Sequence, residues 1–289
     1  MLLRYLLQHG LQRAVRSQLE QAGRAASNLS GETAESAEDA IAELGPVRAG
    51  FVFALEIEAG GIIDALEGAV TTAGTGWTER LGRFHDHTVA IVQSGVGQEA
   101  AASATADLLR VRRPEWVISA GFAGGLTGEM RRGDILMADS VVDSEGHALQ
   151  LGLRIDPDAL EGSPGVHVGR LLTVDQLVRG DDQRQQLHAE HSALAVDMET
   201  AAVAQVCRDS QVRCISVRII SDTVGDVLPP EIERLLDQES TAARVGAALG
   251  ALVRRPSAAK DLWKLKEDAV RAADRLGRFL AGVLPQLVD

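Results

Sequence analysis

The sequence predicts an α/β fold in which helices cover both faces of a β-sheet. From Val47 to about Arg255, short segments rich in β-branched residues alternate with alanine-rich segments of helical periodicity. Such alternation is typical of sheets whose strands are connected through helices. The chain has 289 residues, of which 45% are hydrophobic, so it is long enough to bury a large core.

Each predicted strand is a run of β-branched and other apolar residues, and the last of these runs is typical of a fully buried strand. The predicted strands cover residues 48–55, 88–94, 116–120, 135–142, 169–174 and 213–220.

Both ends of the chain differ from this central region and are predicted to be helical extensions. Residues 1–24 carry leucines near helical spacing, four arginines and a single acid, which predicts an amphipathic helix. We expect its apolar stripe to pack against the core or a second subunit, which favours a homo-oligomer over contact with a membrane surface. The predicted parts are an N-terminal extension over 1–45, a central domain over 46–255 and a C-terminal helical extension over 256–289.

Composition excludes several classes of protein. A net charge of −12 and a pI near 5.1 argue against nucleic acid as a partner, because phosphate binding needs a basic face. Only two cysteines are present, which is too few for a disulfide framework, so a reducing cytoplasm is expected. The chain has no apolar run long enough to span a bilayer and no signal peptide, as judged from the sequence.

Metal binding is not predicted either. His188 and His191 are three residues apart, but no further ligand is placed near them in the sequence. A solvated helix face is the favoured interpretation of this pair, and no cofactor or metal is expected.

The most informative residues are acids in apolar surroundings. Asp197 and Glu199 stand between an apolar entry and an Ala/Val-rich helical segment, and Asp222 ends a predicted buried strand. Burying an unpaired carboxylate costs several kcal/mol, so these acids are either paired or face a ligand cavity.

These segments resemble the purine nucleoside phosphorylase/nucleosidase superfamily, whose members cleave the N-glycosidic bond of nucleosides. Residues 195–204 resemble its E-M-E helix, and residues 217–222 its R-x-x-S-D strand end. Residues 119–126, with the Gly133-Asp134-Ile135 that follows, resemble its T-G-x-A-G-G-L … G-D-I signature. Residues 53–59 resemble the A-M-E-x-E turn of the methylthioadenosine/adenosylhomocysteine nucleosidases.

The turn from Ser94 to Ala101 has two interpretations. Its G-x-G-x-x-A pattern occurs in dinucleotide-binding folds, but these need an acid at the end of the next strand, and the predicted strand from Trp116 has none. In the nucleosidases an S-G-x-G turn lies beside the sugar, where Gly95 would let the backbone approach closely.

The resemblance implies a role for each matching residue. Glu58 would activate the attacking water, and Asp222, oriented by Ser221, would protonate or hydrogen-bond N7 of a purine leaving group. Met198 and Glu199 would hold the ribose.

Four further residues are expected at the same site. Gly121 belongs to the glycine-rich signature, and Arg218 would pair with the acids or contact the nucleophile. Asp197 stands where relatives usually have Glu, and Phe122 where they usually have a small polar residue.

The implied fold is a three-layer αβα domain with a mixed, largely parallel central sheet, plus the helical extensions at both ends. The implied activity is hydrolysis of a purine nucleoside, such as methylthioadenosine or adenosylhomocysteine. Three alternatives stay open: phosphorolysis of a purine nucleoside, hydrolysis of a lipid-linked adenosine nucleoside of the adenosylhopane type, and a non-catalytic nucleoside-binding module.

Overall fold

The structure is a computed structural model that describes residues 41–152, 163–226 and 257–288. The amphipathic helix predicted over residues 1–24, with its expected subunit or membrane contact, lies outside the described residues.

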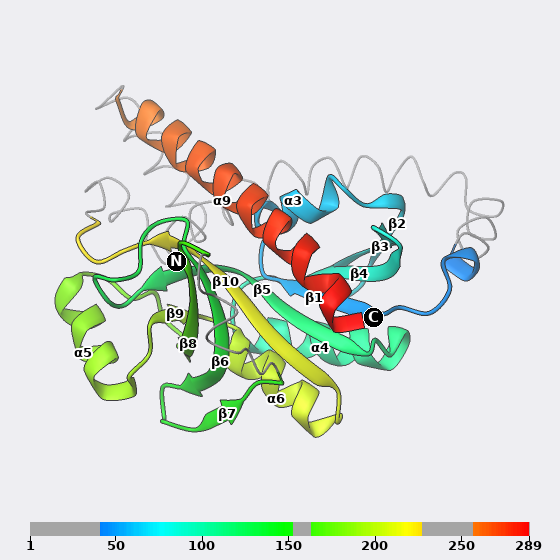
Figure 1. The fold of residues 1–289 in the computed structure, drawn as a ribbon, viewed down its shortest axis with the longest axis horizontal. Coiled ribbons are helices and arrows are strands. Elements are labelled where there is room, and N and C mark those ends of the chain that lie inside the picture. The colour runs from blue at the N-terminus through cyan, green and yellow to red at the C-terminus, as the bar shows by residue number, and fades with distance from the viewer. Residues whose placement is uncertain (1–40, 153–162, 227–256, 289) are drawn as a thin grey trace.

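A ten-stranded mixed sheet forms the centre of the molecule (Figure 1). Its strands run in the order β10-β6-β8-β9-β5-β1-β4-β3-β2, with β7 paired to β6. They are β1 (Ala49–Phe53), β2 (Glu67–Ala73), β3 (Thr78–Phe84), β4 (His87–Gln93), β5 (Trp116–Gly125), β6 (Ile135–Asp143), β7 (Ala148–Gln150), β8 (Val166–Thr173), β9 (Ala195–Asp197) and β10 (Arg213–Asp222).

The sheet is mixed and has helices on both faces, as expected, but it is not largely parallel. Five of the ten strand pairings are antiparallel. Strand β10 pairs with β6 along one edge and with β5 along the other, so β10, β6, β8, β9 and β5 close into a barrel-like ring. The short β9 makes this closure feasible, because its three residues bridge β5 and β8 where these strands diverge.

All six predicted strands are present, and four strands were missed. Strand β2 is mostly exposed and polar, and β7 and β9 have only three residues each, so none of them carries a strong hydrophobic pattern. Strand β5 also continues to Gly125, through a glycine-rich segment that lies beyond the predicted strand.

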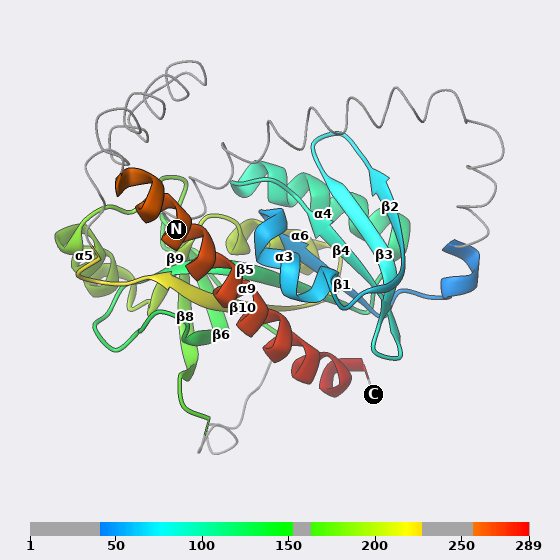
Figure 2. The same cartoon turned by 90° about the horizontal axis from the view of Figure 1, so that it is seen from above.

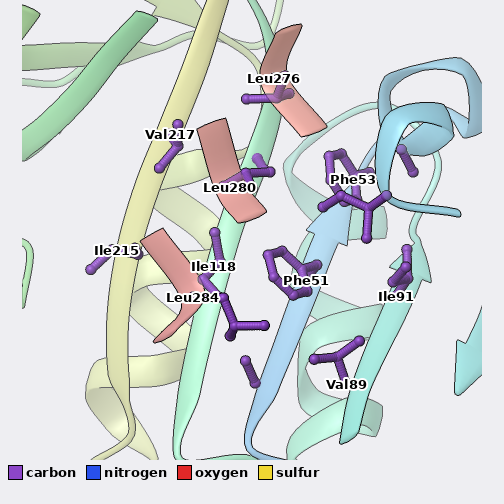
Figure 3. Packing of buried hydrophobic residues seen from close by; sticks show 14 of the residues in the cluster. Phe51, Phe53, Val89, Ile91, Ile118, Ile215, Val217, Leu276, Leu280 and Leu284 are labelled. Carbon is purple, nitrogen blue, oxygen red and sulfur yellow. The ribbon is translucent and has the colours of Figure 1, made fainter. Parts of the chain in front are cut away.

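One face of the sheet is covered by α3 (Glu56–Ile63) and the long α9 (Ser257–Val288), which lie side by side (Figures 1 and 2). Helix α9 lies across β10 and β5, and α3 lies across β1, β4 and β5. Leucines four residues apart in α9 are fully buried against apolar side chains of β1, β5 and β10 (Figure 3). Trp116 Nε1 also donates to the carbonyl of Leu287 at 2.8 Å. The C-terminal segment predicted as an extension therefore contributes to the main core, and the three-part division of the chain stays a prediction.

The opposite face is covered by α4 (Gln98–Arg112) and α6 (Thr200–Asp209). Strand β1 shows how one strand serves both faces: Phe51 and Phe53 pack under α3 and α9, while Val52 packs under α4. The fifth described helix, α5 (Asp181–His191), precedes β9. This arrangement brings the carboxyl ends of the parallel strands β1, β5 and β10 to one edge of the sheet.

Candidate active site

Glu58 is held rigidly just beyond the end of β1. It is the third residue of α3, and its side chain is 1% exposed. One carboxylate oxygen accepts hydrogen bonds from the backbone N–H groups of Ala54 (3.1 Å) and Leu55 (2.8 Å), and the other accepts from Phe122 N–H at 2.9 Å. These three main-chain donors hold the Glu58 carboxyl group in one position at this edge of the sheet.

Arg218, in the middle of β10, is anchored by a buried polar network. Its Nη2 lies 2.8 Å from Asp197 Oδ2 and donates to the hydroxyls of Ser119 and Thr200, each at 2.6 Å. Asp197 is itself fully buried and accepts from the hydroxyls of Thr173 and Thr200. The role of Asp197, which the sequence left in doubt, is to neutralise and orient Arg218.

Gly121 brings Glu58 and Arg218 together. A Cβ at this position would lie 2.7 Å from Arg218 Nη1 and 2.9 Å from Glu58 Oε1, and the glycine has a φ of +148°. Only glycine leaves room for both charged groups at this point of β5. Within the described part of the chain, Nη1 and Nε of Arg218 have no hydrogen-bond partner, although the side chain is 1% exposed. These donors are available to a ligand next to Glu58.

The residues expected at the ribose, Met198 and Glu199, directly follow β9. Glu199 is 2% exposed and accepts a hydrogen bond from Gly97 N–H at 2.7 Å, which ties α6 to the glycine turn after β4. Gly95 in the same turn has a φ of +81°, which few side chains tolerate. Met198 packs in part against an apolar cluster that includes Val196.

Asp222, the last residue of β10, is held by side chains. Its Oδ1 accepts from the Ser221 hydroxyl at 2.7 Å, and its Oδ2 pairs with Arg184 Nη2. Burial raises the pKa of Asp222, but neighbouring positive charge, that of Arg184 included, outweighs this effect and holds the pKa below its usual range. The carboxyl group is therefore ionised in this structure.

Phe122 differs from its expected place. Its side chain is completely buried in the core between the sheet and α9, and its backbone N–H is the group that contacts Glu58. Any role of Phe122 in binding a substrate stays a prediction.

The same architecture occurs in known proteins. The family model described as the phosphorylase superfamily matches residues 48–165 and 148–255. The chain belongs to the phosphorylase superfamily. The predicted class, an enzyme of the nucleosidase or nucleoside phosphorylase kind, is thereby confirmed.

Two curated relatives are 5'-methylthioadenosine/S-adenosylhomocysteine nucleosidases. That of Tolumonas auensis is 27% identical over 215 residues, covering 66% of this chain and 93% of the relative. That of Glaesserella parasuis is 33% identical over 162 residues, covering 49% of this chain and 70% of the relative. The predicted resemblance to this group is confirmed.

Solved structures share the fold. The S-adenosylhomocysteine nucleosidase of Streptococcus pyogenes superposes with a TM-score of 0.63 at 24% identity, covering 84% of this chain and 98% of that one. A futalosine hydrolase of Helicobacter pylori superposes with a TM-score of 0.62 at 18% identity, covering 83% and 99%.

Arg184 belongs to the candidate site of this superfamily member, although the sequence analysis did not identify it. It lies on α5, a polar helix in which it is the one buried residue. Besides pairing with Asp222, it donates from Nη1 to the carbonyl of Gly125 at 2.7 Å. A polar helix with mixed charges gives no sign that its single arginine turns inward, so only the structure reveals it.

A cavity of about 490 Å³ opens beside the ribose residues. It is lined by both ends of the Ser94–Gly97 turn, by Trp77 from the β2–β3 loop and by Asp175 after β8.

The described residues contain no group of three His, Cys, Asp or Glu side chains arranged to hold a metal ion. None of the described helices combines the length and apolar character needed to cross a membrane.

Proposed function

We propose that the chain hydrolyses the N-glycosidic bond of a purine nucleoside, with methylthioadenosine and adenosylhomocysteine as the leading substrates. The observation that carries this proposal is the placement of two carboxylates, Glu58 and Asp222, at the carboxyl ends of β1 and β10, the two parallel strands that flank β5. Arg218 of β10 lies next to Glu58 at Gly121 of β5. Cleavage of this bond needs a proton acceptor for the nucleophile and a proton at the leaving base. Glu58 and Asp222 fit these two roles.

The reaction proceeds through an oxocarbenium-like sugar. The C1'–N9 bond breaks and its electron pair goes to the purine, whose N7 takes a proton from Asp222. A water oxygen bonds to C1', and its proton passes to Glu58, which releases it to solvent. Glu199, fixed by Gly97, accepts hydrogen bonds from the sugar hydroxyls.

Charge favours water over phosphate as the nucleophile. Around the position where the nucleophile would lie, Glu58 and Asp197 provide two carboxylates against the single guanidinium of Arg218. A phosphate dianion binds where several cationic or N–H donors converge, but here the N–H groups of Ala54, Leu55 and Phe122 already bind Glu58. Water carries no charge and is not repelled.

The substrate class rests on the curated relatives, whose names specify methylthioadenosine and adenosylhomocysteine. The cavity next to Ser94 and Gly97 has room for a 5' substituent of the sugar. A lipid-linked adenosine nucleoside is the alternative that the same cavity leaves open.

The test is to incubate the purified protein with a panel of purine nucleosides, with and without phosphate, and to separate the products. Release of free base and free sugar independent of phosphate supports the proposal. Formation of sugar 1-phosphate would make the protein a phosphorylase, and tight binding of every nucleoside without turnover would make it a binding module.

A further inference from the structure

The ion pair between Arg184 and Asp222 is buried at the end of the site assigned to the base. The two side chains are 6% and 8% exposed. Since Ser221 donates to Oδ1 and Arg184 to Oδ2, both oxygens of Asp222 are used as acceptors. In this arrangement Asp222 has no proton to give.

Arg184 has no other evident reason to be buried. The remaining residues of α5 are exposed or half-buried, and an isolated buried guanidinium costs several kcal/mol. Its two observed contacts, Asp222 Oδ2 and the carbonyl of Gly125, both lie at the carboxyl ends of the strands. A side chain needed only for packing would be apolar here.

We propose that Arg184 is a positioning residue that keeps Asp222 charged in the free enzyme. When the purine binds, it replaces Arg184 at Oδ2 of Asp222, and one proton from solvent enters the site with it. The inference rests on the proposed function. The proton that enters with the purine is the one that ends on N7 of the leaving base, while the proton of the attacking water returns to solvent through Glu58. Asp222 is thereby regenerated as a carboxylate, and Arg184 pairs with it again.

The other charges near Asp222 are consistent with this role. Arg132, in the loop between β5 and β6, is the second described cation that acts on Asp222. It is engaged by Asp226 at 3.0 Å and lies 3.8 Å from Asp268 of α9, so these acids offset its charge. Arg184 is thus the described cation in direct contact with the carboxylate, and its displacement removes one of the positive charges that lower the pKa of Asp222.

Proton uptake on ligand binding tests the inference. The adenine probe is 9-methyladenine, whose N7 can only accept a hydrogen bond, because free adenine can carry its own proton on N7 and bind an ionised Asp222 without uptake. It is titrated calorimetrically into the full chain in buffers of different ionisation enthalpy near pH 7. We expect the unchanged chain to take up about one proton and to bind this probe about tenfold more tightly for each unit by which the pH falls. 7-Deaza-9-methyladenine lacks the N7 acceptor and should bind without this uptake.

The variant Arg184→Met should lose the uptake. Without the guanidinium, burial raises the pKa of Asp222, the free carboxyl already carries its proton, and binding of the adenine probe becomes insensitive to pH around neutrality. Arg184→Lys keeps the charge and should retain most of the uptake. Arg170→Met is the matched control, because Arg170 also anchors α5, from β8 and through the carbonyl of His191 at 3.0 Å.

The outcomes separate the two proposals. If the unchanged chain cleaves no nucleoside, the proposed function fails. The role of Arg184 is overturned if the unchanged chain cleaves nucleosides but binds the adenine probe without proton uptake. It is also overturned if Arg184→Met takes up as many protons as the unchanged chain. The measurement on the unchanged chain decides the matter even if Arg184→Met does not fold.

Discussion

The two ends of the candidate site hold their carboxylates in different ways. Glu58 is bound by three backbone N–H groups, which can neither ionise nor rotate away. Asp222 is bound by two side chains, the hydroxyl of Ser221 and the guanidinium of Arg184, which can exchange partners. A base that accepts a proton from water needs only to stay charged, whereas a group that delivers a proton must change its state during each turnover. The difference in support therefore matches the difference in the proposed roles.

The largest effect is expected from Glu58→Gln. The amide keeps the shape of the side chain but cannot take the proton of the attacking water, so the rate of hydrolysis should fall by about 10³-fold, within the range for general base catalysis. One carbonyl oxygen cannot satisfy three N–H donors in this geometry, so stability should fall by about 1–3 kcal/mol as well.

Two measurements check this prediction. Steady-state hydrolysis gives the loss of rate, and calorimetry should show that adenine binding is retained, because adenine does not contact the nucleophile. Activity that survives the change and requires phosphate would reverse the assignment of water as the nucleophile.

Asp222→Asn should reduce kcat on a purine nucleoside by about 10²-fold, because the leaving base then departs without a proton. The matched substrate is p-nitrophenyl riboside, whose leaving group departs as a stable anion and needs no N7 proton. Its hydrolysis should suffer much less than that of methylthioadenosine. Equal losses on the two substrates would mean that Asp222 acts on the sugar or on the structure.

Two glycines of β5 offer a smaller and more selective comparison. Gly121→Ala introduces a methyl group 2.7 Å from Arg218 Nη1 and 2.9 Å from Glu58 Oε1, at a φ of +148°, so it disturbs the nucleophile end. Gly124→Ala introduces one 3.1 Å from both Arg184 Nη1 and Asp222 Oδ2 and has no such backbone restriction. We expect Gly121→Ala to cost about 1–3 kcal/mol of stability.

Gly124→Ala should cost less, because flexible side chains can give way by a few tenths of an ångström. Denaturant unfolding measures both costs, and the two substrates above report which end is disturbed. Only Gly124→Ala should affect methylthioadenosine more than p-nitrophenyl riboside. If Gly121→Ala and Gly124→Ala lose activity on the two substrates in the same ratio, the two glycines do not distinguish the two ends of the site.

Sequence patterns predicted the six strongly hydrophobic strands, because a buried β-branched run needs no tertiary information to be recognised. They missed the closure of the sheet, which depends on β10 pairing along both edges and on a β9 of three residues. Neither property has a local signal. The parallel bias of the prediction follows from assuming that every strand is followed by a helix, whereas β2, β3 and β4 follow one another as antiparallel neighbours.

The site shows the same limit. Asp222 was identified because it ends an apolar segment, where a charge needs a reason, and Glu58 and Arg218 were identified by their resemblance to family motifs. Arg184 was missed because it is one charge among many on a polar helix. The support of a catalytic group comes from elements distant in sequence, here 38 residues away for Asp222, and this pairing exists only in the fold.

The smallest effect is expected from Ser221→Ala. The hydroxyl donates to Asp222 Oδ1 at 2.7 Å and, at 3.3 Å, lies within reach of the carbonyl of Ala123. Its loss removes one hydrogen bond to a charged acceptor, worth about 1.5–3 kcal/mol at most, while the pairing with Arg184 remains. We expect kcat on a purine nucleoside to fall about tenfold, because the carboxyl is less well oriented, and the proton uptake on binding of the adenine probe to persist. Arg184, and not Ser221, is proposed to keep Asp222 charged. A Ser221→Ala variant that takes up no proton would therefore show that the hydroxyl controls the ionisation of Asp222. The contrast between the two ends of the site would then depend on Ser221 and not on Arg184.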